Sequence, residues 1–307
     1  MLQTLYAYYA TPEKSISQSQ QELFFSLGKS YDLYHLLLLL IIDLSDFARK
    51  RIENNLNKHR PNKEDLQPNR KFTENKLIEQ LRINRRLQSY LHQTKISWAQ
   101  HPELIKEMLG YVTDSVVYAE YMQDKENSYY ADKIFVEKLL NEVILSAEDL
   151  HLVLEEDSIY WNDDIDLVVA MVVKTLRGFN KESDENQPLM ELFKDDDDRQ
   201  FARDLLRLVA EHHDDLRSII DLHASNWDIE RIAFMDILIM QLALTEFIYF
   251  PTIPTKVTLN EYIELAKYYS TDKSRNFING ILDKALKELR QEDKVHKTGR
   301  GLIGEQN

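Results

Sequence analysis

The sequence contains no cysteine and only 7 glycines and 7 prolines among its 307 residues. Without thiols the chain has no disulfides, thiolate metal sites or cysteine nucleophiles, and a reducing cytoplasm is the compartment we expect. Glycine and proline both fall well below their usual shares of about 7% and about 5%. This scarcity excludes glycine-rich phosphate loops and many tight turns, so it favours helices.

Basic residues are too few to balance the acidic ones. The sequence has 38 Lys/Arg and 52 Asp/Glu, a net charge of -14. Phosphate binding draws its free energy from basic side chains, so general affinity for a polyanion is excluded. The deficit is uneven: residues 43–87 carry +5, residues 103–166 carry -13, and residues 256–300 carry +3. Any contact with nucleic acid is therefore expected to be local.

Long hydrophobic runs are also missing. The longest, Leu36 to Ile42, is far shorter than the roughly 18 to 20 residues that cross a bilayer. Met1 to Ala10 carry no charge, so the positive start of a secretory signal is absent. We therefore expect no membrane partner.

Apolar residues recur at helical spacing along almost the whole chain, and no stretch shows sustained strand alternation. The fold class we predict is all-α, without a β-sheet. Leu36 to Ile42 is apolar all round and should be buried on every side. Polar connections are expected at 59–67 and 179–188. Helices are predicted over 20–58, 70–98, 102–123, 130–154 and 163–178.

Capping signals divide the last third of the chain. Asp195 to Asp198 precede one apolar helix, and Asn226 is the predicted N-cap of a helix that carries Ile229 to Phe247 and stops before Pro251. Thr258 and Glu261 have capping-box spacing for the next helix. The final helix should follow Thr271 or Asp272. After Arg290 the sequence is polar, which predicts a flexible tail over 293–307.

Catalytic and metal-binding signatures are weak. His212, His213, Asp214 and Asp215 are adjacent, but neighbours on a helix point about 100° apart, so at best His212 and Asp215 share a face. Residues 162–166 resemble the start of a calcium loop, yet the turn glycine and the last glutamate are missing. Nucleophile-elbow, P-loop and dinucleotide motifs do not occur. We predict no enzyme, no catalytic residue, no metal and no cofactor.

The C-terminal third nevertheless carries a specific pattern, which resembles the NusB transcription antitermination family. Five pieces in order carry the resemblance: 226–232 (NWDIERI), 242–247 (LALTEF), 253–261 (IPTKVTLNE), 264–267 (ELAK) and 277–284 (FINGILDK). Residues 201–206 (FARDLL) look like the family's second helix, and residues 2–9 (LQTLYAYY) look like the end of its first. The match covers about 1–10 and 195–290.

The resemblance implies a non-enzymatic, all-helical factor in ribosomal RNA synthesis. Such a protein pairs with NusE, a ribosomal protein of the small subunit, binds boxA-type RNA and acts on the transcription elongation complex. Two features depart from the family pattern. The chain begins at Met1-Leu2 without the arginine-rich turn that contributes to RNA contact, and residues 11–194 stand where a short loop is usual.

These departures leave the domain plan and two alternative functions open. We expect the end of the first NusB-like helix at 1–10, a helical insertion at 11–194 packed on the core, the NusB-like domain at 195–292, and the tail. One alternative is a protein scaffold of the same family with little RNA affinity. The other is a NusB-like domain associated with ribosomal RNA methylation, which would require a catalytic domain after residue 307.

Candidate site residues follow from the resemblance and from charge. Lys273, Arg275, Asn276 and Phe277 are predicted to form an RNA-facing patch at the start of the final helix, where the dipole and backbone N–H groups favour phosphate. The alternative is that the two cations are solvated and Phe277 belongs to the core. The predicted partner contacts are Asp228, Glu230 and Glu246, and the alternative for each is a solvated helix charge.

Two further expectations concern other positions. Arg49, Lys50, Arg85 and Arg86 could replace the missing arginines as a second basic surface, and a solvated helix face is the alternative. Asn279-Gly280 places a residue without a side chain inside a helix, which predicts close packing of another helix there.

Overall fold

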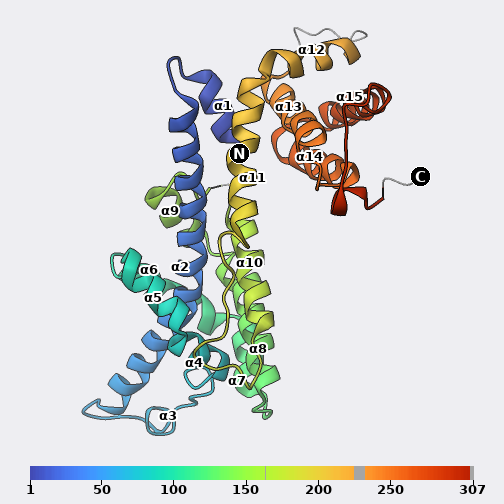
Figure 1. Cartoon of the computed structure of the whole chain (residues 1–307). Coiled ribbons are helices and arrows are strands. Elements are labelled where there is room, and N and C mark those ends of the chain that lie inside the picture. The colour runs from blue at the N-terminus through green and yellow to red at the C-terminus, as the bar shows by residue number, and fades with distance from the viewer. Residues whose placement is uncertain (163, 225–231, 305–307) are drawn as a thin grey trace. The chain divides into compact units, whose positions relative to one another are not determined.

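The computed structural model describes residues 1–162, 164–224 and 232–304, and in these it contains helices and no strand (Figure 1). The all-α prediction is confirmed. The chain divides into two compact units: unit 1 comprises Met1–Phe25 and Phe193–Asn307, and unit 2 comprises Ser26–Leu192. The long helix α2 (Ile16–Leu56) contributes its first residues to unit 1 and the rest to unit 2.

Unit 1 is built around a helix that is apolar on every side. This central helix is α13 (Phe234–Tyr249). The other helices of unit 1, besides the start of α2, are α1 (Leu2–Ala10), α11 (Asp196–Glu211), α12 (His213–His223), α14 (Thr255–Tyr269), α15 (Asp272–Gln291) and the 3-10 turn η3 (Gly299–Leu302). Every residue of α13 from Asp236 to Phe247 is buried. Helices α1, α11, α12, α14 and α15 all contact α13, so its surface is covered by helices from both ends of the chain.

Unit 2 has its own core, which is centred on α2. The remaining helices are α3 (Lys63–Leu66), α4 (Lys76–Ile83), α5 (Arg85–Thr94), α6 (Pro102–Asp114), α7 (Val116–Gln123), α8 (Tyr129–Lys138), the π-helix η1 (Leu139–Ile144), α9 (Glu148–Asp157) and α10 (Ile165–Gly178). Leu36 to Ile42 lie in this core as predicted, with only Leu39 partly exposed.

Helix α2 also bears on the question of membrane spans. Among the described residues it is the one helix long and apolar enough to cross a bilayer by length and composition, with a mean hydropathy of 1.3 over its best window. That window is 56% buried, and its apolar side chains pack against the other helices of unit 2. The hydropathy of α2 therefore has a structural explanation as a core helix.

Polar caps break the longer apolar patterns into short helices. Asn84 ends α4 and caps α5 by accepting a hydrogen bond from the N–H of Leu87 at 3.0 Å. Ser115 separates α6 from α7 and accepts from the N–H of Tyr118 at 3.1 Å. The segments predicted as single helices over 70–98 and 102–123 are therefore each two helices, because a side-chain oxygen replaces the continuing backbone bonds.

Unit 2 is shorter than the predicted insertion, by 15 residues at its start and 2 at its end. Residues 11–25 and 193–194 belong to unit 1, where the side-chain amide of Gln20 donates to the carbonyl of Arg203 at 3.1 Å. The rings of Phe24 and Phe193 also meet there, with centroids 6.0 Å apart. These contacts join the two segments of the chain that lead into and out of unit 2.

Helix starts in unit 1 confirm two predicted caps and correct two others. Asp195 caps α11, and Thr271 caps α15. The prediction that one helix runs from Asn226 to Phe247 is wrong for its described part, because Ala233 is extended and α13 begins at Phe234. Asn226 itself lies outside the described residues. Thr258 is not a cap, because α14 begins at Thr255 after an extended Pro254.

The structure also differs from two expectations near the end of the chain. A Cβ added at Gly280 would meet nothing within 4 Å, so no helix packs closely there and Gly280 faces solvent. The predicted tail is anchored: the N–H of Thr298 donates to the carbonyl of Pro251 at 2.9 Å. Gly301 is buried against that same carbonyl, where a Cβ would approach to 2.0 Å. Close approach of two backbones holds this segment although its side chains are polar.

Candidate nucleic-acid interface

The start of α15 brings part of the predicted RNA patch to the surface. Thr271 caps the helix by accepting from the N–H of Ser274 at 3.2 Å. Lys273 and Asn276 are exposed, and Arg275 is half-buried with its guanidinium 3.5 Å from Asp272 Oδ1. Phe277 is buried and belongs to the core of unit 1. The available surface is therefore formed by Lys273, Asn276 and the ion-paired Arg275.

A fully presented aromatic side chain precedes this helix. Tyr268, in the last turn of α14, is 82% exposed, whereas Tyr269 next to it is half-buried. The side-chain amide of Gln3 in α1 donates to the Tyr269 hydroxyl at 3.2 Å. Ser270 donates to Asp236 Oδ1 in α13 at 2.6 Å. The corner between α14 and α15 is thus tied to two other helices while the Tyr268 ring stays free to contact a ligand.

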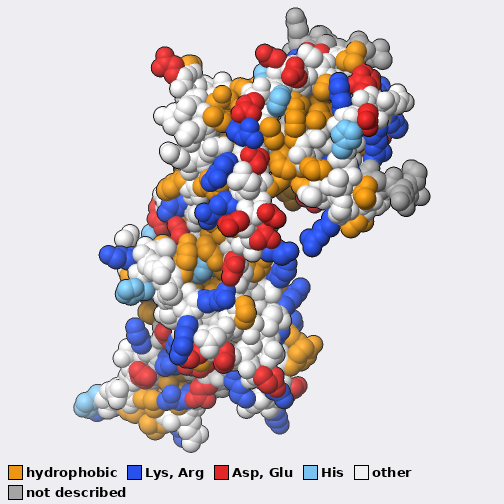
Figure 2. Space-filling model, in the orientation of Figure 1, with side chains coloured by type: hydrophobic (Ala, Val, Ile, Leu, Met, Phe, Trp, Pro, Cys, Tyr) orange, Lys and Arg blue, Asp and Glu red, His pale blue; other side chains and the backbone are white. Residues whose placement is uncertain are grey.

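The prediction from sequence missed Tyr268, although a signal for it was available. Two adjacent tyrosines on a helix point about 100° apart. If only one face of the helix packs on the core, both rings cannot be buried there. A solvent-facing aromatic ring offers a surface on which a nucleic-acid base can stack. Figure 2 shows Lys/Arg and Asp/Glu interspersed over the visible face of the molecule, without a large basic patch. Base stacking on an aromatic ring would therefore add binding energy that the surface charge does not provide.

Aromatic side chains continue along α1. Tyr6, one helical turn from Gln3, is partly exposed, and its ring centroid lies 5.8 Å from that of Phe234. Tyr9 lies deeper, with its ring 4.5 Å from the ring of His213 and its hydroxyl donating to the Val209 carbonyl at 3.4 Å. Burial raises the pKa of the Tyr9 hydroxyl. Of these α1 residues, Gln3 therefore borders the corner.

Glu246, one of the three predicted partner contacts, is buried in α13. Its side chain is only 5% exposed, and it accepts hydrogen bonds from Thr258 Oγ1 at 2.5 Å and from the Tyr262 hydroxyl at 3.1 Å. Burial raises the pKa of this carboxyl above its usual value. Glu246 joins α13 to α14 and is not available to a partner, so this prediction is corrected. Asp228 and Glu230 lie outside the described residues.

Three of the four cations predicted as a second basic surface have acidic neighbours in unit 2. Arg85 pairs with Glu185, Arg86 pairs with Glu191 at 2.9 Å, and Arg49 lies 3.9 Å from Glu79. Lys50 is exposed. Their charge is largely balanced within the unit.

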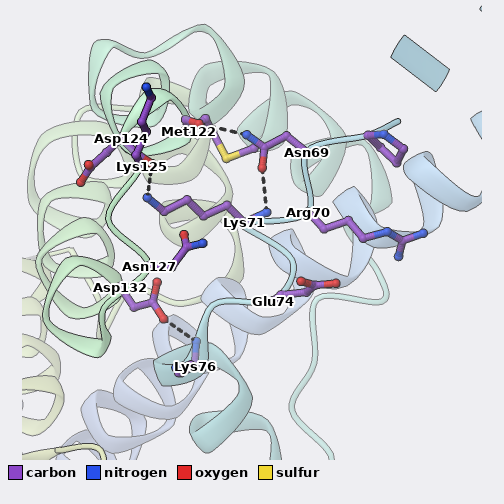
Figure 3. A pocket seen from close by; sticks show the side chains of 11 residues that line it. Asn69, Arg70, Lys71, Glu74, Lys76, Met122, Asp124, Lys125, Asn127 and Asp132 are labelled. Carbon is purple, nitrogen blue, oxygen red and sulfur yellow. Dashed lines mark hydrogen bonds between the residues drawn. The ribbon is translucent and has the colours of Figure 1, made fainter. Parts of the chain in front are cut away.

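Another group of cations in unit 2 lines a pocket of about 480 Å³ (Figure 3). Lys71 reaches the loop after α7, where its ammonium donates to the carbonyls of Asp124 and Glu126 at 2.8 and 2.7 Å, and Arg70 points the other way. The charged side chains that line it have both signs: Arg70, Lys71, Lys76, Lys125, Glu74, Asp124 and Asp132. The pocket therefore lacks the converging positive charge that a phosphate requires.

The histidine and aspartate cluster of unit 1 has structural contacts. His212 and Asp215 share a face as expected, with Nδ1 and Oδ2 3.7 Å apart. The carbonyl of His213 accepts from the side-chain amide of Gln241 at 3.1 Å. Within the described ranges no group of three or more His, Cys, Asp or Glu side chains is placed to hold a metal ion.

Comparison with known proteins places these observations in a family. A model of the NusB family matches residues 166–287, which begin within α10 and end within α15. The chain is 42% identical over 113 residues to transcription antitermination protein NusB of Salinibacter ruber, covering 37% of this chain and 71% of that protein. No solved structure matches.

Two further relatives carry the same name. The chain is 41% identical over 105 residues to NusB of Chloroherpeton thalassium, of which it covers 50%, and 40% identical over 111 residues to NusB of Geobacter sulfurreducens, of which it covers 80%. Each similarity involves about a third of this chain. An identity near 40% over most of two relatives, with an all-helical unit, shows that the chain belongs to the NusB family.

Proposed function

We propose that this protein is a non-enzymatic transcription antitermination factor that pairs with NusE and binds boxA-type RNA during ribosomal RNA synthesis. Family membership supports the general role, and the corner between α14 and α15 supports the RNA contact. The observation that carries the proposal is the exposed ring of Tyr268 close in sequence to the exposed Lys273 at a helix N-terminus. Such a surface combines base stacking with attraction for phosphate.

Residues of the corner have separate tasks in this proposal. Lys273 provides an exposed positive charge for a phosphate, and Arg275 is pre-positioned by Asp272 to contact a second one. Tyr268 stacks on an unpaired base, and Asn276 donates or accepts a hydrogen bond at a base edge. Phe277 acts from inside by packing the first turns of α15 on the core.

Binding of a fluorescent boxA-type RNA to the intact chain, with and without purified NusE, tests the RNA contact. Tyr268→Ala should weaken binding by about 5- to 150-fold, since one stacked base is worth about 1–3 kcal/mol. Lys273→Glu should weaken binding and reduce the slope of log affinity against log salt by about 0.7, the value for one phosphate on a single strand.

Lys284→Glu is the matched control for charge. Lys284 is exposed on the same helix, eleven residues further along, and the substitution changes the net charge equally. If Lys284→Glu weakens binding as much as Lys273→Glu, general repulsion explains both results and the corner is not the site. If wild-type chain binds NusE but not RNA, the protein is a scaffold of the family with little RNA affinity, an alternative that its charge of -14 favours.

NusE contact is proposed at Asp228 and Glu230, which suit a basic ribosomal protein. Glu230→Lys should weaken NusE binding without changing the melting temperature of unit 1. Glu292→Lys, at the exposed C-cap of α15, is the control with the same charge change. Loss of folding in Glu230→Lys would instead assign this residue a structural role.

A further inference from the structure

Unit 2 contains a groove between α7 and α8 with a volume of about 330 Å³, next to the pocket of Figure 3, with which it shares Asp124. Its floor consists of Tyr121 and Phe135, whose rings stack with centroids 3.9 Å apart and planes inclined by 10°. The Tyr121 hydroxyl donates to Asp132 Oδ1 at 2.5 Å and accepts from the Asn75 amide at 3.2 Å. These bonds fix the floor, so the groove is preformed.

Apolar side chains continue from the floor to the surface. Val117, Ala131 and Ile134 line the groove and are half-buried. Tyr130 lines it as well and is 70% exposed. An exposed aromatic ring beside a fixed apolar floor is the arrangement in which a few side chains supply most of the affinity of an interface.

Acidic side chains surround this apolar surface. Glu120, Asp124 and Glu126 line the groove and are exposed, against one cation, Lys138. Within the described parts of the chain these three carboxylates form no ion pair. Lys71 holds the backbone of the loop that carries two of them. The groove also lies in the most acidic part of the sequence, residues 103–166 with a net charge of -13.

Charge decides between the possible occupants. The rim repels the phosphates of RNA, so a nucleic acid is disfavoured. In a second copy of this chain the complementary segment would be 43–87, but four of its seven arginines already meet carboxylates of their own chain. Arg82 Nη2, for example, lies 2.6 Å from Asp46, and Arg86 pairs with Glu191. We infer that the α7–α8 groove is a docking site for a basic segment of another protein that inserts one aliphatic or aromatic side chain over the Tyr121–Phe135 floor.

A designed peptide serves as the probe. A fluorescein-labelled 14-residue peptide of Lys and Arg, with Leu and Phe at helical spacing, is titrated into the intact chain. In one control peptide Leu and Phe are replaced by Ser, and in the other Lys and Arg are replaced by Glu. The first peptide should bind at least tenfold tighter than either control, because the groove requires both the charge and the apolar anchor.

Variants locate the binding. The double variant Glu120→Lys with Glu126→Lys should weaken binding about tenfold, and Tyr130→Ser should weaken it more than threefold. The matched control is Glu155→Lys with Glu156→Lys, two exposed residues of α9 in the same acidic stretch. This control should change the affinity less than twofold, since it alters the net charge equally but lies outside the groove lining.

Four outcomes would overturn the inference. Equal losses in both double variants, or equal binding of the Ser peptide, would mean that a negative protein attracts any cation. Self-association of the chain in ultracentrifugation that disappears in the groove variant would identify a second copy as the occupant. If the groove variant does not fold, Tyr130→Ser decides alone, because an exposed side chain is replaced and unchanged peptide affinity would refute the site.

Discussion

Replacing Glu246 tests whether a buried carboxylate holds α13 to α14. In Glu246→Ala the Tyr262 hydroxyl loses its acceptor inside the core, and the Thr258 hydroxyl keeps only a long bond to the Pro254 carbonyl at 3.4 Å. A buried polar group left unpaired costs about 1–3 kcal/mol. Removal of the buried charge offsets part of this loss. We expect unit 1 to be destabilised by about 2–4 kcal/mol.

Glu246→Gln separates the charge from the hydrogen bonds. The amide keeps the shape and one acceptor oxygen, and it removes a charge whose burial raises the pKa of the carboxyl. Since the folded-state pKa lies above the unfolded value of about 4.3, the unfolded state releases its proton first as pH rises. The wild-type chain therefore loses stability with rising pH between these two pKa values, and the Gln variant does not. At pH 7 the Gln variant should match or exceed the wild type.

Hydrogen exchange of the α13 amides is the appropriate assay, because it measures unit 1 separately from unit 2. Glu261→Gln, an exposed carboxylate on α14, is the control and should leave exchange unchanged. A loss in Glu246→Gln as large as in Glu246→Ala would refute the reasoning, since the charge itself would then be stabilising. Weaker NusE binding by a stably folded Gln variant would restore Glu246 as a partner contact.

Three other predictions follow from buried or exposed single residues. His35 is 2% exposed, and burial lowers its pKa from 6.5 to about 4, so unit 2 should lose up to about 3 kcal/mol of stability as pH falls from about 6.5 to 4. In urea titrations followed by tryptophan fluorescence, His35→Phe should flatten this pH dependence, and an unchanged slope would contradict the prediction. Gly280→Ala should stabilise α15 by about 0.5–1 kcal/mol in hydrogen exchange, and destabilisation would mean that its surface is covered. Gly301→Ala should release the C-terminal segment to proteolysis, because its Cβ would collide with the carbonyl of Pro251, whereas intact protection would show that the segment adapts.

Helix patterning predicted the fold because the signal is local and repeated. The burial of Leu36 to Ile42 follows from a run with apolar residues on all faces, and the caps at Asp195 and Thr271 follow from side-chain chemistry. Interruptions at Asn84 and Ser115 were missed because one polar residue hardly changes the periodicity, although each ends a helix by bonding to the next one. Capping competes with helix propagation at a single residue, which a window of many residues averages away.

Candidate site residues were predicted less well, since family position and charge do not report depth. Glu246 lies in α13, a helix with apolar residues on every face, and that pattern alone predicts that its side chain is buried in the core. Gly280 was interpreted as a packing position, yet its side of α15 is open. Tyr268 was missed because aromatic residues are usually counted as core. Each error came from assigning a role to a residue by its type, without first asking which face of the helix it occupies.

Net charge illustrates the same point at a larger scale. A net charge of -14 argues against nonspecific RNA binding over the whole surface. At physiological salt, however, screening limits the range over which each exposed charge acts to about 8 Å. At the α14–α15 corner the charges of the proposed RNA contact are those of Lys273, Arg275 and the nearby Asp272. The proposed docking groove between α7 and α8 has an acidic rim of its own, formed by Glu120, Asp124 and Glu126. An acidic protein can thus present one surface to an anion and another to a cation, because each ligand responds only to the charges within a screening length.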